Sequence, residues 1–514
     1  MHQHSKLNKI HPTASDYVGV ILAAGVGSRL RPMTNTVPKC MVKTAGKPII
    51  EYQINAYRTA GVKEIIIVAG YQGQAVRNYC KHINDIKVTV IDNQDYENTN
   101  NMYSFYLARN FIGQRPYILN NADLAIDPSI VNIMLHSEAA SAVAVDTSQF
   151  IDESMKVVVN KDGFVCDISK KITKEKSSGC SIDFYKFSLQ DGQEFISEVT
   201  SIIEEENNLK DWTEVALQRI FQMQKLKFSI IDVSELQWVE IDNYADLAIA
   251  DRKFSNFDQD LENIKTVFLD LDGTVYVGSN LIEGARTTIA ALRQMKKKIY
   301  FLSNNSSRNK LDYIEKLESM GIPSLDDDII LSTDAVLNYL KSEKVRKVHI
   351  LGTNSLKRTF LDTGFQIDSP DPEFVVVGYD TELDYKKLIV ACTHINKGVD
   401  MIATHCDAFC PSEVGPIPDI GALLEMLKIS TGKMPIKIFG KPESTMVQHV
   451  LSRDKLDPSQ VLFVGDRLHT DIQMAKNAGS RSLLVLTGET TRDVCQDSPI
   501  QPDYILPSLA SLLN

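Results

Sequence analysis

The sequence lacks several features that would assign it to particular classes of protein. It has no run of about 18 apolar residues, so we expect no membrane-spanning helix. Its polar start lacks the apolar stretch of a signal peptide, and we expect a flexible tail at 1–16 and a cytoplasmic protein. The formal net charge of -11 argues against a nucleic-acid partner. The eight cysteines include no two pairs at zinc-site spacing, so we expect reduced thiols.

Short apolar runs alternate with helical stretches, such as Ile50–Ala60, through both halves of the 514 residues. This alternation predicts an α/β fold with buried parallel strands. In the first half, the expected strands are Val18–Leu22, Glu64–Ala69, Lys87–Ile91, Tyr117–Leu119, Ala142–Val145 and Phe228–Val233. In the second half they are Val267–Leu269, Ile299–Leu302, Lys347–Leu351, Phe374–Val377, Met401–Ala403, Lys437–Phe439, Val461–Val464 and Ser482–Leu486.

A glycine-containing loop follows the first expected strand. Gly25 and Gly27 would let backbone N–H groups approach a triphosphate closely. We expect the loop to open a helix, whose N-terminus favours anions. Arg29 and Lys39, the latter in a Pro-Lys pair, can neutralise phosphates as charge moves to the leaving pyrophosphate.

The string from Leu22 to Thr34, followed by Pro38-Lys39, resembles the signature of the sugar-nucleotidyltransferase superfamily. The likeness extends over residues 18–252, and the segments Gly46–Gln53 and Asn100–Ser104 resemble the choline-phosphate cytidylyltransferase-like enzymes. It implies CTP as the nucleotide and Mg²⁺ held by Asp123 and Asp242. The implied nucleotide-binding residues are Leu22, Ala23, Ala24, Gly25, Gly27, Ser28, Arg29, Lys39, Asn101 and Ser104.

The acceptor of this reaction is less defined. Where the choline enzymes carry aromatic residues, this chain reads Asp152-Glu-Ser-Met-Lys156. Lys156 could bind the phosphate or phosphonate of an acceptor, or it could be a solvated surface lysine. Lys170 and Lys171 carry the same two readings. The acceptor is expected to be a small phosphorylated alcohol: a polyol phosphate, choline phosphate or a compound like aminoethylphosphonate.

A second set of polar residues follows strands of the second half. Asp270 and Asp272 are spaced so that the first could attack phosphorus and the second could protonate the leaving oxygen. A calcium loop is excluded because the downstream oxygen ligands and final Glu are missing. The remaining members can donate hydrogen bonds to a phosphoryl group, clamp its charge or supply Mg²⁺ ligands: Ser303, Asn304, Asn305, Lys441, Asp466 and Asp471.

This order resembles the four motifs of the haloacid dehalogenase (HAD) superfamily, and details resemble its NagD-like and p-nitrophenylphosphatase-like subclass. The likeness covers residues 265–514 and implies an α/β cap at about 314–433. The implied Mg²⁺ ligands are Asp270, Asp272, Asp466 and Asp471, with Ser303 and Lys441 as catalytic residues and Asn304 and Asn305 contacting substrate. Asp380, Thr404 and Asp407 are possible cap contacts, or merely structural. A metal site in His405–Cys410 is disfavoured.

We therefore expect a tail at 1–16, a Rossmann-like nucleotidyltransferase domain at 17–252, a linker at 253–264 and a HAD-type phosphatase domain at 265–514. The expected protein is a bifunctional enzyme, and a homodimer is possible. Its partners would be CTP, a phosphorylated acceptor and a small phosphomonoester, with Mg²⁺ in both domains, in the synthesis of a surface polysaccharide or related polymer. The alternatives are a transferase with a non-catalytic HAD scaffold, and a nucleotide-sensing regulatory protein.

Overall fold

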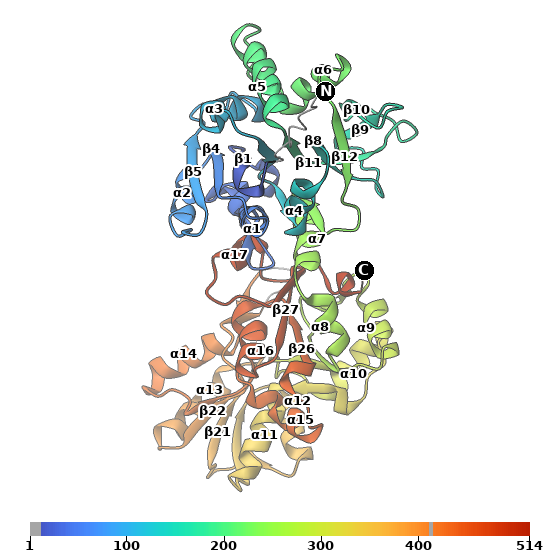
Figure 1. Ribbon diagram of the computed structural model, residues 1–514. Coiled ribbons are helices and arrows are strands. Elements are labelled where there is room, and N and C mark those ends of the chain that lie inside the picture. Colours follow the sequence, from blue (N-terminus) through green and yellow to red (C-terminus); the bar gives the residue numbers. More distant parts are fainter. Residues whose placement is uncertain (1–11, 411–414, 514) are drawn as a thin grey trace, which may run out of the picture. The chain divides into compact units, whose positions relative to one another are not determined.

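The computed structural model describes residues 12–410 and 415–513, and the chain divides into two compact units after Phe254 (Figure 1). Most of the predicted tail, residues 1–11, lies outside the described residues, while Ala14–Asp16 form a short 3-10 turn. No helix within the described ranges is both long enough and apolar enough to cross a bilayer.

A nine-stranded mixed sheet organises the first unit. Strand β1 (Val18–Ala23) pairs in parallel with β4 (Glu64–Ala69) and β6 (Tyr117–Asn121), and β5 (Lys87–Asp92) extends the parallel part beyond β4. The long strand β11 (Gly179–Phe187) then runs antiparallel to β6. The remaining strands lie beyond it: β8 (Ser141–Asp146), β9 (Lys156–Val159), β10 (Val165–Ser169) and β12 (Phe228–Asp232).

Helices cover both faces of this sheet because alternate residues of its strands are apolar on both sides. In β1, Ile21 packs in one hydrophobic cluster, whereas Val20 and Leu22 pack in the other. The first cluster includes residues of α1 (Ile49–Thr59), α2 (Gly73–Cys80) and α4 (Ser129–His136), and the second includes residues of α3 (Asn101–Ile112), α5 (Leu189–Glu204) and α6 (Thr213–Gln222). The unit ends with α7 (Tyr244–Phe254).

The second unit contains a six-stranded parallel sheet in the order β18-β17-β14-β26-β27-β28. Its members are β14 (Thr266–Asp270), β17 (Lys298–Ser303), β18 (Ile329–Leu331), β26 (Val461–Gly465), β27 (Arg481–Val485) and β28 (Tyr504–Leu506). The predicted linker, 253–264, includes α8 (Phe257–Asn263), and Phe257, Leu261 and Ile264 are buried in the core of this unit. The helices of this sheet are α9 (Ala285–Gln294), α10 (Lys310–Ser319), α15 (Thr445–Arg453), α16 (Gln473–Asn477) and α17 (Arg492–Asp497).

A second parallel sheet is inserted between β18 and β26 and forms the cap. Its order is β20-β19-β21-β22-β25, with β19 (Lys347–Leu351), β20 (Gln366–Ile367), β21 (Phe374–Val377), β22 (Asp400–Ala403) and β25 (Lys437–Ile438). Figure 1 shows helices α13 (Tyr385–Asn396) and α14 (Ile420–Thr431) beside β21 and β22, while α11 (Ser332–Ser342) and α12 (Asn354–Asp362) contribute to its other hydrophobic cluster.

The cap begins later than the sequence predicts and ends later as well. Strand β18 pairs with β17, so it belongs to the core sheet although it lies within the predicted range 314–433. Strand β25 pairs with β22 and extends the cap sheet to Ile438. The α/β fold class is confirmed in both units, with parallel strands at the centre of each.

Candidate active sites

A cavity of about 320 Å³ opens where β1 and β6 end in the first unit. Nine residues predicted to bind nucleotide or metal line it: Leu22, Ala23, Ala24, Gly25, Arg29, Lys39, Asn101, Ser104 and Asp123. Carboxyl ends of neighbouring parallel strands meet at one edge of a sheet, which explains why segments far apart in sequence converge here. Gly27, Ser28, Asp242 and Lys156 are not among the lining residues.

Lys39 is the centre of an ionic cluster beside this cavity. Its Nζ lies 2.8 Å from Oδ2 of Asp123 and 2.6 Å from Oδ1 of Asp242, and Arg29 Nη1 lies 2.9 Å from the other oxygen of Asp242. Burial alone would lower the pKa of Lys39, but the two carboxylates raise it above its ordinary value. The ammonium thus remains charged, and Asp242 belongs to the site through it.

The same cluster contains oxygen donors suited to Mg²⁺. Carboxylate oxygens of Asp123, Glu240 and Asp242 lie within 4.8 Å of one another, and hard oxygen ligands are those that Mg²⁺ prefers. Burial, together with Asp123 and Asp242, raises the pKa of Glu240 to about 7. Glu240 is a site residue that was not predicted from the sequence, although it ends β13 (Trp238–Glu240) and alternation along the chain would place it on the same side as Asp242.

The glycine loop does not open the expected helix. Ser28–Leu30 form only a 3-10 turn, a second such turn follows at Met33–Asn35, and a third begins at Lys39. Pro32 removes a backbone donor that a continuing helix would need. Gly27 acts by packing instead: its φ is +66°, and a Cβ there would lie 2.8 Å from Cβ of Lys39. Gly27 therefore permits the close approach of Lys39, while Ser28 only begins the turn.

Asn101 and Ser104 lie on the first turn of α3 and face the cavity. Asn101 Nδ2 donates to Oδ1 of Asn121 at 3.2 Å, and its own Oδ1 accepts from the backbone N–H of Thr213 at 3.0 Å. Ser104 Oγ accepts from Nδ2 of Asn93 at 3.1 Å. These bonds fix the polar rim between β6 and α6.

Lys156, predicted to contact the acceptor, is held elsewhere. It is 1% exposed, its Nζ donates to the carbonyl of Asp152 at 2.7 Å, and it lies 5.1 Å from the ring centroid of Phe150. Both earlier readings of Lys156 are therefore wrong, because it is neither a cavity residue nor a surface lysine. Lys170 does line the cavity, with Nζ 5.2 Å from the ring centroid of Trp212. Lys171 is not among the lining residues.

The cavity wall near Trp212 carries two buried carboxyl groups that sequence analysis missed. Asp183 accepts from Nδ2 of Asn121 at 3.1 Å, and Glu214 accepts from the hydroxyl of Tyr185 at 3.2 Å. Burial and the neighbouring Glu214 raise the pKa of Asp183 well above its usual range. Each lies in a stretch without a recognisable motif, so only the fold brings them together.

A second cavity, of about 590 Å³, lies between the core and cap sheets of the second unit. Asp270 ends β14, Ser303 ends β17, and Asp466 follows β26 directly. Six predicted residues line it: Asp270, Asp272, Ser303, Asn304, Asn305 and Lys441. The motif residues that follow β14, β17 and β26 thus meet at the carboxyl edge of the core sheet. Lys441 comes from the segment after β25 of the cap sheet and joins them from that side.

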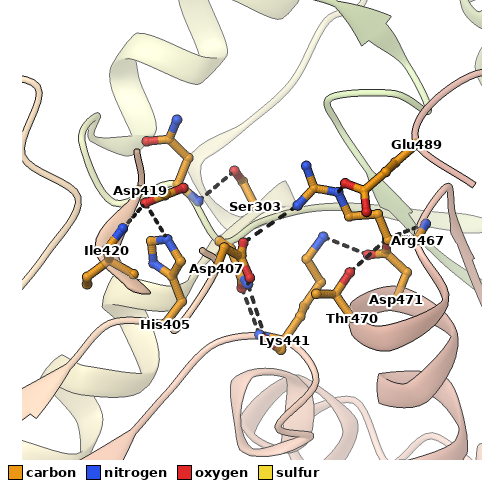
Figure 2. Close-up of polar contacts among 12 residues, drawn as sticks. Ser303, His405, Asp407, Asp419, Ile420, Lys441, Arg467, Thr470, Asp471 and Glu489 are labelled. Atoms are coloured by element: carbon orange, nitrogen blue, oxygen red, sulfur yellow. Dashed lines mark hydrogen bonds and ion pairs between the residues drawn. The ribbon is translucent and has the colours of Figure 1, made fainter. Parts of the chain in front are cut away.

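Lys441 is buried among carboxylates in this second cavity. Its Nζ bonds Asp270 and lies 2.7 Å from Oδ1 of Asp471, and Figure 2 shows its ammonium directed toward Asp471. Asn304 holds the lysine backbone, since its Oδ1 accepts from Lys441 N at 2.7 Å and its Nδ2 donates to Lys441 O at 3.2 Å. Asn304 is therefore a positioning residue for Lys441.

Three buried carboxylates provide a site that fits Mg²⁺. Oxygens of Asp270, Asp466 and Asp471 lie within 4.8 Å of one another. Oδ1 of Asp466 is buried and has no hydrogen-bond partner among the described residues, as expected for an atom that binds a cation. Burial and Asp471 raise the pKa of Asp466 to about 6. Asp272, the fourth predicted ligand, is outside this cluster because its side chain is exposed toward the cavity.

Asp272 is therefore free to exchange protons. Its backbone bridges that of Tyr276, and burial raises its pKa above the usual range for a carboxyl group. A protonated carboxylic acid can donate to a leaving alkoxide. Nearby, Ser303 Oγ lies 3.1 Å from the hydroxyl of Tyr313, whereas Asn305 Oδ1 accepts from the N–H of Ser307 at 2.9 Å and stabilises the turn.

Cap and core residues meet through Arg467, which lies between two acidic side chains in Figure 2. Its guanidinium is 3.0 Å from Glu489 and 3.8 Å from Asp407 of the cap. Of the three possible cap contacts, Asp407 lines the cavity. Asp380 instead pairs with Lys387 at 2.9 Å and is not a lining residue.

Two further cap residues have structural contacts. Thr404 is buried and bonds Ser306 Oγ at 2.8 Å. His405, Asp407 and Asp419 lie close enough to hold a metal, but His405 Nε2 already contacts Asp419 at 3.1 Å. These contacts account for the group without an ion.

Comparison with known proteins identifies both units. Residues 18–228 match the Nucleotidyl transferase family, residues 267–366 the Haloacid dehalogenase-like hydrolase family, and residues 438–512 the related HAD-hydrolase-like family. An acid sugar phosphatase from Staphylococcus haemolyticus is 34% identical over 251 residues, which cover 48% of this chain and 95% of that protein.

Solved structures with similar sequences include two phosphatases. A 4-nitrophenylphosphatase from Thermotoga maritima is 38% identical, covering 49% of this chain and 97% of that one, with a TM-score of 0.48. A glycerol phosphate phosphatase from Mycobacterium tuberculosis, solved with magnesium, is 29% identical, covering 49% and 78%, with a TM-score of 0.46. The chain thus belongs, through its second unit, to the haloacid dehalogenase-like hydrolases, and carries a nucleotidyl transferase domain before it.

Proposed function

We propose that the first unit transfers a cytidylyl group from CTP to a small phosphorylated alcohol and releases pyrophosphate. The observation that carries this proposal is the convergence of Gly25, Lys39 and Asp123 on one cavity, with Asp242 bonded to Lys39. A phosphate oxygen of the acceptor would attack the α-phosphorus of CTP, the bond to the β-phosphate oxygen would break, and pyrophosphate would leave. No covalent enzyme intermediate is needed.

The residues of this unit have distinct parts in that reaction. Arg29 and Lys39 would balance the charge that develops on the transferring phosphoryl group and the leaving pyrophosphate. Asp123 and Asp242, with Glu240 beside them, would hold Mg²⁺, which supplies Lewis-acid polarisation of phosphate oxygens when bound. The choice of CTP rests on resemblance to the cytidylyltransferase subgroup.

The acceptor end of the cavity favours a molecule that carries both an anionic phosphate or phosphonate and a cationic group. Lys170 is available for a phosphate or phosphonate, and the indole of Trp212, 43% exposed, offers an aromatic face to a cation. Asp183 and Glu214 lie on the same wall. Among the acceptors considered, choline phosphate and aminoethylphosphonate-like compounds fit this wall better than a polyol phosphate, which has no cationic group.

We propose that the second unit hydrolyses a phosphomonoester in two steps. The carboxylate of Asp270 attacks phosphorus, and Asp272 donates its proton to the leaving alcohol oxygen. Asp272 then takes a proton from the water that attacks the aspartyl-phosphate, releasing phosphate and restoring Asp270. Lys441 balances the phosphoryl charge, and Asp270, Asp466 and Asp471 would hold Mg²⁺, which adds positive charge beside the phosphoryl group when bound.

The proposal also covers the compartment, the assembly and the pathway of the two reactions. We place the enzyme in the cytoplasm, as a monomer or homodimer, in a route to a surface polysaccharide or related polymer. A non-catalytic HAD scaffold is the main alternative, and the intact set Asp270, Asp272, Lys441 and Asp466 disfavours it. A nucleotide sensor is the other, and it would release no pyrophosphate.

The first experiment measures pyrophosphate release with Mg²⁺, crossing four nucleoside triphosphates with choline phosphate, aminoethylphosphonate, glycerol phosphates and longer polyol phosphates. The Asp270→Asn protein is used so that acceptors are not hydrolysed. Rapid pyrophosphate release from CTP with one of these acceptors supports the proposal. No pyrophosphate release with any combination would count against transfer by this unit.

The two variants Asp270→Asn and Asp123→Ala test whether the sites are separate. We expect the first to abolish phosphatase activity and spare transfer, and the second to do the reverse. If either folded variant lost both activities, the two-site proposal would be refuted.

A further inference from the structure

Two cations in the phosphatase cavity have no part in the chemistry described above. Lys316 lies on α10, Arg308 lies in the segment between β17 and α10, and both line the cavity that contains Asp272. Lys316 is half-buried and Arg308 is exposed. Among the residues that the structure describes, neither forms a salt bridge with a carboxylate, although Asp272 interacts electrostatically with both.

The other two cations of the cavity differ in this respect. Lys441 contacts two carboxylates, and Arg467 contacts Glu489 at 3.0 Å and Asp407 at 3.8 Å. Their charges are therefore balanced by the protein itself. The positive charge left for a ligand is that of Lys316 and Arg308.

These two charges border the proton donor. The Nζ of Lys316 lies 3.5 Å from the ring centroid of Tyr276, and the backbone of Tyr276 bridges that of Asp272. Under the proposed phosphatase reaction, Asp272 protonates the oxygen of the departing alcohol. The rest of that alcohol then has to fit in the cavity that Asp272, Lys316 and Arg308 line together.

Charge balance favours an anion in this place. Burial lowers the pKa of Lys316, and the charge of nearby Asp272 does not fully offset this cost of holding an ammonium partly away from water. A substrate carboxylate or second phosphate beside these cations would form charge-assisted hydrogen bonds.

We propose that the phosphatase substrate carries a second anionic group on its leaving alcohol, and that Lys316 and Arg308 bind this group. The inference rests on the proposed phosphatase function and narrows it to one substrate class. Carboxylate and phosphate share the required chemistry, and the two are separated by the choice of test esters.

The test compares esters that differ in one group, using the full-length protein with Mg²⁺. Glycerol phosphate is compared with phosphoglycerate, in which a carboxylate replaces the terminal hydroxymethyl group, and propanediol monophosphate is compared with propanediol bisphosphate. We expect kcat/KM to be about tenfold to hundredfold higher for at least one anionic ester, as a charged hydrogen bond in a shielded site allows. Equal or lower values for both anionic esters would overturn the inference.

Variants then assign the preference to the two residues. Lys316→Met and Arg308→Met should each remove most of the preference, and Lys316→Arg should retain it. Lys341→Met, the same change on an exposed lysine of α11 outside the cavity, is the matched control and should leave the preference intact.

The variants also separate binding of the anion from other roles. If Lys316→Met lowered kcat/KM equally for neutral and anionic esters, the lysine would serve the phosphoryl group or the fold, and the inference would be wrong. A wild-type protein that hydrolyses none of these esters, nor p-nitrophenyl phosphate, would refute the phosphatase function itself. Hydrolysis without preference would refute only the narrower substrate class.

Discussion

Replacing one carboxylate of the phosphatase cluster should stabilise the metal-free protein while abolishing its activity. Asp466 is 2% exposed and lies among Asp270 and Asp471, so its ionised form is unfavourable when no metal is bound. Asp466→Asn keeps the shape of the side chain, and its amide oxygen can still accept the N–H of Glu489, now 2.7 Å away. The variant therefore removes charge with little loss of packing.

The pKa of Asp466 sets the size of this effect. A carboxyl group with a pKa of 3.8 in the unfolded chain and about 6 in the folded protein destabilises the folded state by about 3 kcal/mol when it is ionised. Because the folded pKa is the higher one, this penalty is full above pH 6 and disappears as the pH falls toward 4. At pH 7.5 in EDTA, Asp466→Asn should therefore raise the melting temperature of the second unit by about 6 to 12 °C.

Calorimetry, with tryptophan fluorescence as a control, can isolate the second unit. Both tryptophans, Trp212 and Trp238, lie in the first unit, so tryptophan fluorescence follows that unit alone and should not change. The increase should shrink at pH 4.5, and Mg²⁺ should stabilise the wild-type protein more than the variant. A folded variant that is equally stable or less stable at pH 7.5 in EDTA would refute the electrostatic reasoning.

Four further substitutions test the positions of other side chains. Lys39→Met should lower kcat for transfer by about a hundredfold or more, measured as pyrophosphate release, because it removes a buried cation from the phosphate site. Lys170→Met should raise KM for the acceptor about tenfold, whereas Lys156→Met should leave that KM unchanged, because only Lys170 lines the cavity; equal effects would contradict this placement. Gly488→Ala should weaken Mg²⁺ activation of the phosphatase by about tenfold, since its Cβ would lie 2.0 Å from Oδ2 of Asp466; unchanged Mg²⁺ dependence would show that the loop yields easily.

Parallel strands were the most predictable part of this fold. Runs such as Glu64–Ala69 and Phe374–Val377 are buried on both faces after their first residue, so their sequences are apolar apart from Glu64, and their bounds agree with the structure. Strand β11 was not predicted, although it is the longest of the first sheet. Its sequence contains Ser181, Asp183 and Lys186 among apolar residues, and their polar groups are satisfied by partners that only the folded chain provides.

The site residues also differ in how far the sequence predicts their positions. Asp270 ends one apolar strand of the core sheet and Asp466 follows another, so their convergence is a consequence of a parallel sheet that the sequence indicates. Lys441 follows β25 of the cap sheet, so only the fold brings it to them. Lys156 also precedes an apolar run, but its side chain turns toward Asp152 and away from the cavity. Spacing along the chain predicts which strand end a residue occupies, whereas the direction of its side chain depends on packing that spacing does not encode.

The two sites share one electrostatic arrangement but differ in how far it is exposed to water. In each, a lysine ammonium lies between two carboxylates that precede or follow strands: Lys39 contacts Asp123 and Asp242, and Lys441 contacts a pair that includes Asp471. The lysine holds together carboxylates that would otherwise repel each other without a metal ion.

Exposure to water decides how strongly the carboxylates of each cluster repel one another. The side chain of Asp242 is 37% exposed, so water screens the cluster of the transferase unit, whereas that of Asp471 is 4% exposed. The phosphatase cluster also has a third carboxylate without a matching cation, because Arg467 is shared with Glu489. Removal of the metal should therefore destabilise the second unit more than the first, and neutralising one buried carboxylate should reverse that loss only in the second.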